Sequence, residues 1–123
     1  MKETRDIILR LIKIRQAERL TNNKGMSADD IQKLRDFILE NRRRVPPFAL
    51  SHFDRLEASG GRGIAAIENG KCSFCGTPVP KDELDYLEKA KNIGVCDRCY
   101  AFLYIPDDDC KIGDFFENLL KSE

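Results

Sequence analysis

The chain is poor in the features that most enzymes and membrane proteins need. It has a single histidine, His52, among 123 residues, which leaves no Ser-His-Asp set, and it has no glycine-rich phosphate loop. No apolar run approaches the roughly 18–20 residues that a membrane span requires, and the N-terminus lacks the basic-then-apolar order of a signal peptide. We therefore expect a non-enzymatic protein of the cytoplasm that has no contact with a membrane.

Net charge is also absent, because 21 Lys and Arg residues balance 21 Asp and Glu residues. The positive and negative charges are, however, distributed unequally on the two sides of the first cysteine. Residues 1–71 carry 15 basic and 10 acidic residues, a net charge of +5, whereas residues 72–123 carry 6 and 11, a net charge of −5. Any nucleic-acid contact is therefore expected in the first part of the chain.

Hydrophobic residues are too few for core burial to hold the fold unaided. They make up 41% of the chain against 34% charged residues, which leaves material for only a modest core. The chain also shows no internal repeat and no low-complexity tract. A second source of stability is therefore expected.

A metal site formed by four of the five cysteines is the expected second source of stability. They form two C-x2-C pairs, Cys72 with Cys75 and Cys96 with Cys99, separated by 20 residues. Two residues between the members of a pair let both sulfurs converge on one ion, which predicts a closed tetrahedral site for one structural Zn²⁺. Rubredoxin-type iron is the alternative metal. Cys110 is interpreted as a spare thiol.

A metal held by four protein thiolates has no open position for substrate, so the site is expected to be structural rather than catalytic. Structural zinc contributes on the order of 10–16 kcal/mol in small metal-folded units. Chelation is therefore expected to unfold residues 64–105 first. Gly76, directly after the first pair, is expected to take a positive φ that turns backbone N–H groups toward the sulfurs.

Apolar spacing predicts helices in the first part of the chain. Residues 6–20 and 27–44 carry apolar side chains at steps of three and four, and the short connection makes them an antiparallel hairpin. Pro46-Pro47 ends the second helix, and a third follows over residues 48–58. The stripes are too short for a hairpin that is stable alone, so we expect packing against the third helix, the C-terminal segment or a second copy in a homodimer. The stripe residues are Ile7, Leu11, Ile14, Ile31, Leu34 and Ile38.

The remaining chain predicts a small β unit. Residues 63–67 form a strand that leads into an Asn69-Gly70 turn, residues 82–91 a helix, and residues 101–105 a strand. The fold class is thus α+β, with a helical part over 1–60, a zinc ribbon over 61–106, and an acidic linker with a C-terminal amphipathic helix over 107–123. The apolar side chains of that last helix are expected to dock on the hairpin; they are Phe115, Phe116, Leu119 and Leu120.

Several motifs of residues 44–106 occur in a characteristic order. A Gly-x-Ala strand precedes the Asn-Gly turn, Val79-Pro80 follows the first cysteine pair, and Leu103-Tyr104 follows the second. This order resembles the bacterial four-cysteine zinc-ribbon family that carries an N-terminal coiled-coil hairpin. The resemblance implies a non-enzymatic protein, since members are described as nucleic-acid-binding proteins or as regulatory adaptors and chaperones of flagellar and type III secretion systems.

The chain departs from that family at two places. Its helical hairpin is shorter than the family's coiled coil. In addition, Tyr100-Ala101 stand where the family has Gly-Arg, so the second cysteine turn is expected to differ from the first.

A weaker resemblance is to RNA polymerase regulators of the DksA/TraR type, which join a helical hairpin with an acidic tip to a four-cysteine finger. Asp29 and Asp30 lie at the predicted tip. A helix of about 17 residues, however, spans only about 25 Å, which is short for reaching into a channel.

Candidate contact residues have structural alternatives. Arg42, Arg43 and Arg44 suit phosphates or a protein partner, but also the C-terminal end of a helix. Asp29 and Asp30 suit a basic partner, but also helix capping. Arg62 and Lys71 lie close to the ribbon and complete the set of candidate phosphate or partner contacts. His52 is interpreted as an ordinary helical residue.

Taken together, these patterns favour a regulatory or adaptor protein that works through contacts with a protein partner. The alternative is a nucleic-acid-binding module or an RNA polymerase-binding regulator.

Overall fold

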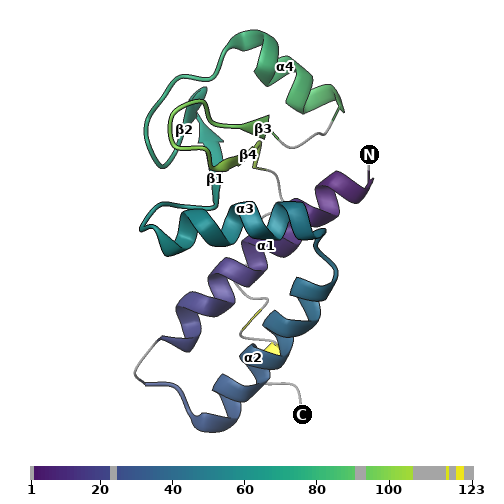
Figure 1. The fold of residues 1–123 in the computed structure, drawn as a ribbon, viewed down its shortest axis with the longest axis vertical. Helices are drawn as coiled ribbons and strands as arrows, with labels where there is room; N and C mark the ends of the chain where they lie inside the picture. The colour runs from purple at the N-terminus through teal and green to yellow at the C-terminus, as the bar shows by residue number, and fades with distance from the viewer. Residues whose placement is uncertain (1, 23–24, 91–93, 107–115, 117–118, 121–123) are drawn as a thin grey trace.

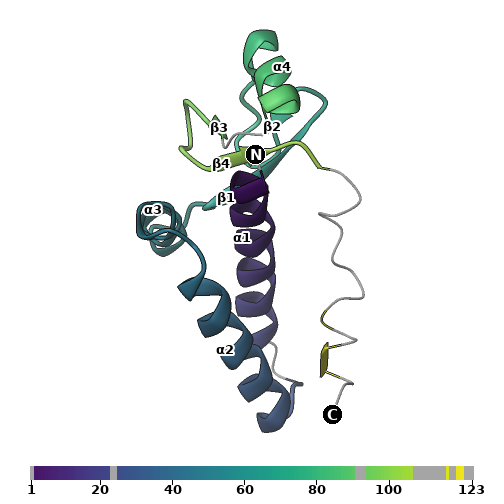
Figure 2. The ribbon, with the colours of Figure 1, turned by 90° about the vertical axis from the view of Figure 1, so that its right-hand side faces the viewer.

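A helical hairpin forms one end of the molecule and a small sheet the other (Figure 1). The computed structural model describes residues 2–22, 25–90, 94–106, 116 and 119–120. Helices α1 (Lys2–Thr21) and α2 (Ala28–Arg43) run antiparallel, and α3 (Pro47–Ala58) crosses the hairpin below the sheet. Both views place the N-terminal half of α1 close to the sheet (Figure 2). The predicted hairpin and third helix are confirmed.

Side-chain hydrogen bonds stabilise both ends of α2. The Oγ of Ser27 caps the helix by accepting a hydrogen bond from the backbone N–H of Asp30 at 3.2 Å. Near the other end, the guanidinium of Arg42 donates to both carboxylate oxygens of Asp54 on α3, at 3.0 and 2.6 Å. A bidentate pair of this kind fixes the angle between α2 and α3 more firmly than a single contact would.

The sheet contains four short strands in the order β2-β1-β4-β3. They are β1 (Ile64–Glu68), β2 (Lys71–Cys72), β3 (Gly94–Val95) and β4 (Phe102–Tyr104), and α4 (Lys81–Ala90) lies between β2 and β3 in the chain. Strand β1 pairs antiparallel with β2 but parallel with β4. The predicted turn is present, since Asn69 and Gly70 have φ values of 54° and 73°, as a two-residue hairpin turn requires.

Strands β2 and β3 did not emerge from the sequence. Each has only two residues, which is too few for a periodic pattern to show. The Asn69-Gly70 turn brings β2 alongside β1, and the second cysteine turn brings β3 alongside β4; the apolar sequences of β1 and β4 did predict strands.

The sheet separates two hydrophobic cores, because successive residues of a strand point to opposite faces. Ile64 and Phe102 belong to a core with α1 and α3, whereas Ala65, Ile67 and Leu103 belong to a core around the cysteines. The helical core also contains Ile8, Leu11, Ile14, Val45, Ala49 and Phe53. The ribbon core also contains Cys72, Val79, Leu87, Cys96 and Ala101. The sheet is therefore part of both the helical core and the ribbon core.

A third cluster lies farther along the hairpin, where Ala17 and Leu34 pack with Phe116. The rings of Phe37 and Phe116 meet edge to face, with centroids 5.2 Å apart. Leu119 and Leu120 pack against the same cluster, so these three side chains dock on the hairpin as expected. Phe115, Cys110 and the rest of the expected C-terminal helix lie outside the described residues.

Gly63 carries a steric prediction. A Cβ at this position would lie 2.4 Å from the ring of Phe53, which is 1% exposed. Gly63→Ala is therefore expected to destabilise the protein by about 1–3 kcal/mol, the usual cost of overpacking a core. Urea unfolding measures the change. Gly25→Ala is the control, because a Cβ there meets no atom within 4 Å, and an equal loss in both variants would contradict the steric explanation.

Candidate metal centre

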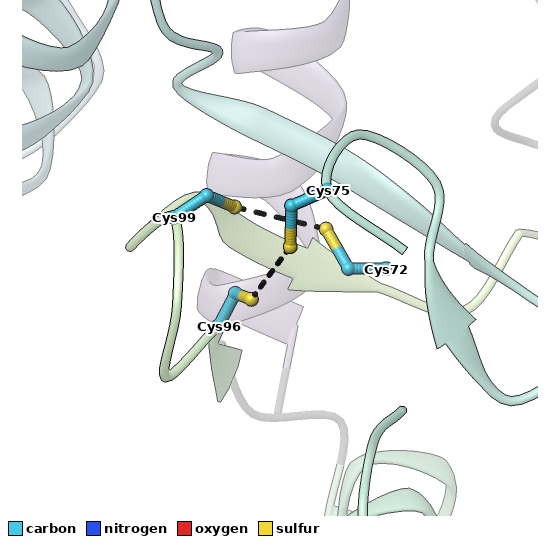
Figure 3. A group of neighbouring side chains, drawn as sticks. All are labelled: Cys72, Cys75, Cys96 and Cys99. Carbon is cyan, nitrogen blue, oxygen red and sulfur yellow. Dashed lines mark hydrogen bonds between the residues drawn. The ribbon is translucent and has the colours of Figure 1, made fainter. Parts of the chain in front are cut away.

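The four predicted ligands converge on one point (Figure 3). Their Sγ atoms all lie within 4.8 Å of one another. Across the cluster, the sulfurs of Cys72 and Cys99 are 3.7 Å apart, and those of Cys75 and Cys96 are 3.5 Å apart. Four sulfurs bound to one tetrahedral ion at about 2.3 Å would be about 3.8 Å apart. The cluster therefore fits a metal ion held by four thiolates.

Two equivalent cysteine turns build the cluster. In the first, the N–H of Gly76 donates to the carbonyl of Cys72 at 2.8 Å, and the N–H of Cys72 donates to the carbonyl of Thr77 at 2.9 Å. In the second, the N–H of Tyr100 donates to the carbonyl of Cys96, and the N–H of Cys96 donates to the carbonyl of Ala101, both at 3.0 Å. The backbone thus presents both pairs of sulfurs in the same way.

Tyr100 corrects one expectation. Its φ of 64° is close to the 79° of Gly76 at the equivalent position of the first turn. The second turn therefore follows the first although it lacks a glycine. A non-glycine residue in this left-handed region costs roughly 1–2 kcal/mol, so the surrounding structure must hold Tyr100 in place.

His52 contributes to holding Tyr100 and, as predicted, lies on a helix. From α3, its Nε2 donates to the carbonyl of Tyr100 at 2.6 Å, and its ring lies 4.7 Å from that of Phe102 between centroids. The two partners are 48 positions apart in the chain. No pattern in the sequence could have connected them.

The thiols differ in acidity. The hydrogen bond between the Cys75 sulfur and the Thr77 hydroxyl, at 3.1 Å, is the main cause that lowers the pKa of Cys75 to about 6, and the backbone N–H of Thr77 adds to it. Burial raises the pKa of Cys99 to about 12, against the effect of the backbone N–H of Ala101. Backbone N–H groups thus turn toward the sulfurs in the first turn, as expected, and also in the second. Since a cation favours thiolates, metal binding is expected to release protons and to weaken in acid.

The three consecutive arginines pair with carboxylates of the same chain. Arg42 is engaged with Asp54, while Arg43 and Arg44 lie 3.8 and 2.9 Å from carboxylate oxygens of Glu40. Arg43 and Arg44 remain exposed, so they can still meet a partner. Arg42 would have to give up its bidentate pair.

The other candidate contacts lie on three separate parts of the molecule. The Nε of Arg62 donates to the carbonyl of Ile64 at 2.9 Å, and Lys71 is exposed on β2 opposite Glu68. Asp29 and Asp30 lie in the first turn of α2, far along the hairpin from the cysteines. The structure therefore gathers the four cysteines into one site, but it does not gather the charged candidates.

No helix among the described residues has the length and apolar character needed to cross a membrane.

Comparison with known proteins gives a likeness in fold. Neither a protein-family model nor a curated protein sequence matches the chain. The solved structure of CT398 from Chlamydia trachomatis matches 63% of this chain with a TM-score of 0.53 and 22% sequence identity. The matched region is 34% of CT398, so this chain corresponds to about a third of that protein's length. The chain is thus similar to part of CT398 in fold and has the four-cysteine cluster of a zinc ribbon.

Proposed function

We propose that this protein is a non-enzymatic adaptor in which one Zn²⁺, bound by Cys72, Cys75, Cys96 and Cys99, holds a surface that a protein partner recognises. Zinc is favoured because tetrahedral sites with four thiolates are typical of structural zinc. All four positions around the ion are occupied by protein sulfur. The metal then has no position left for substrate, which supports a structural role.

Two exposed aromatic side chains, Phe74 and Tyr100, flank the cysteines, and we call them the knuckle patch. Phe74 directly precedes Cys75 and Tyr100 directly follows Cys99, so each Cα lies about 3.8 Å from that of a ligand. The two residues are 46% and 58% exposed. Aromatic residues are enriched in protein interfaces, and a metal-bound turn presents them with little conformational entropy left to lose.

Tyr100 is the observation that carries the proposal. It occupies a backbone conformation that glycine adopts at lower cost, and more than half of its surface faces solvent. Packing does not account for the retention of such a side chain. Strained residues of this kind gather at functional sites, where the strain positions a group for contact.

A nucleic-acid-binding role has less support. The ribbon over residues 61–106 has no net positive charge, since 6 basic residues balance 6 acidic ones, and four bound thiolates with one Zn²⁺ add negative charge. Phosphate binding needs a basic face, whereas Arg42, Arg43 and Arg44 are paired with Asp54 and Glu40.

Affinity purification of the zinc-loaded protein from its native cells tests the adaptor role. A protein partner is expected to be recovered in near-stoichiometric amount. The double variant Phe74→Ser/Tyr100→Asn is expected to lose at least nine-tenths of it, since central aromatic anchors contribute about 2 kcal/mol or more each. Asparagine is chosen because it tolerates the left-handed conformation.

The matched control is Phe48→Ser, because Phe48 is 71% exposed but lies on α3. It should retain the partner. Equal loss in the control and the double variant, or recovery of nucleic acid that nuclease treatment removes together with any protein, would contradict the proposal.

A further inference from the structure

A groove between α1 and the sheet collects three arginines. Arg15 and Arg19 come from α1, Arg62 comes from the segment before β1, and Gln16 adds an amide. Ile64 and Tyr104 form part of its apolar side. The cavity has a volume of about 140 Å³. We call it the arginine groove, and the adaptor role does not use it.

The charge of Arg15 is only partly compensated in this groove. Its Nε is buried and lies 3.0 Å from a carboxylate oxygen of Glu57, yet among the described residues it has no aligned hydrogen-bond acceptor. Burial lowers the pKa of Arg15, and the positive charge of Arg62 lowers it further, against the opposing effect of Glu57. The folded chain therefore holds like charges together at a cost that Glu57 only partly offsets.

The groove has little acidic compensation. Glu57 is the carboxylate that lies against Arg15, the charge of Glu18 also acts on Arg15, and no Asp or Glu among the described residues lines the cavity itself. Three guanidinium groups with these two carboxylates leave a net positive charge. Guanidinium groups bind phosphate oxygens through paired N–H donors, and their planar forks suit this better than a lysine does.

We propose that the arginine groove binds a phosphate group in its dianionic, monoester form. The net positive charge of the groove attracts an anion, the guanidinium groups of Arg19 and Arg62 supply N–H donors for its oxygens, and the apolar side formed by Ile64 and Tyr104 suits the carbon atoms of a small ester. The volume of about 140 Å³ admits one compact group. Free phosphate and a small phosphate ester share this chemistry.

Nuclear magnetic resonance of the zinc-loaded full chain tests the proposal through the arginine Nε–H signals. Inorganic phosphate, added at constant ionic strength and at a pH above its second pKa, is expected to shift the signals of Arg15 and Arg62 with saturation. Acetate should cause no saturating shift, because it is a monoanion. Glycerol phosphate, with glycerol as its control, then tests whether an ester binds more tightly than free phosphate. Tighter binding of glycerol phosphate supports contact with the apolar side. Binding no tighter than that of inorganic phosphate removes that part of the proposal.

Two variants test the residues. Arg19→Gln is expected to weaken phosphate binding about tenfold or more, as the loss of a charged hydrogen-bond donor does. Arg62→Lys keeps the charge and loses the fork, so it should weaken binding less than Arg62→Gln. Arg35→Gln is the control, because Arg35 is exposed on α2 and does not line the groove.

Several outcomes would overturn the site. One is a phosphate-induced shift that does not saturate, or that acetate causes equally. Another is a loss of phosphate affinity in Arg35→Gln equal to that in Arg19→Gln. A third is binding of an oligonucleotide without terminal phosphate at Arg19 and Arg62 when phosphate itself does not bind. None of them bears on the knuckle patch. The two proposals therefore fail or succeed separately.

Discussion

Removal of the metal by a chelator is expected to unfold the end of the molecule around the four cysteines. Structural zinc contributes on the order of 10–16 kcal/mol in comparable units, whereas four of the eight buried residues in the ribbon core are alanines or cysteines. Hydrogen exchange measures the loss residue by residue. Amides of β2, the two cysteine turns and β3 are expected to lose protection first, and those of α1 and α2 last.

The shared sheet refines the expectation that residues 64–105 unfold together. Ile64 and Phe102 pack in the helical core and not around the cysteines, so β1 and β4 should retain protection longer than β2 and β3. Simultaneous loss in all four strands would indicate that the sheet has no stability without the metal. Unchanged protection after complete metal removal would contradict a structural role of the site.

Cysteine substitutions identify the ligands and the metal. Cys99→Ser is expected to reduce the bound metal from one ion per chain to a small fraction, because a neutral hydroxyl replaces a thiolate. Cys110→Ser is the control and should leave metal content unchanged if Cys110 is a spare thiol. Elemental analysis of the purified protein then distinguishes zinc from iron, and a dominant iron content would replace zinc in the proposal.

Truncation of Phe53 is expected to have the largest effect of any change outside the metal site. Phe53 is 1% exposed and packs in the core that joins α1, α3 and the sheet. Phe53→Ala should destabilise the zinc-loaded protein by about 3–5 kcal/mol, since it leaves a cavity that the surrounding backbone cannot fill. Urea unfolding followed by circular dichroism measures the difference.

Phe48→Ala provides the matched comparison, because the same residue type on the same helix is 71% exposed. Its effect should remain within about 0.5 kcal/mol. Similar destabilisation by the two substitutions would show that the helical core does not depend on Phe53. Metal content should be unchanged in both variants, which separates this effect from loss of the zinc site.

The sequence alone determined the elements whose signals are local. Stripes at steps of three and four gave the helices, Ser27 marked the start of α2, and Asn69-Gly70 marked the hairpin turn. The four-cysteine cluster was equally readable, because C-x2-C spacing places two sulfurs within one turn. Each helix, turn and cysteine pair is marked by residues fewer than six positions apart, and the repeat of the C-x2-C spacing after 20 residues predicted that both pairs bind one ion.

Only the tertiary structure decided the relations between distant segments. The parallel pairing of β1 with β4, the bond from His52 to Tyr100 and the meeting of Arg15 with Arg62 each join residues more than 30 positions apart. The partition of alternate β1 residues between two cores also required the fold, because all of Ile64 to Ile67 are buried and show no apolar-polar alternation. Local spacing specifies which elements form, whereas their contacts depend on the packing of side chains that the sequence keeps far apart.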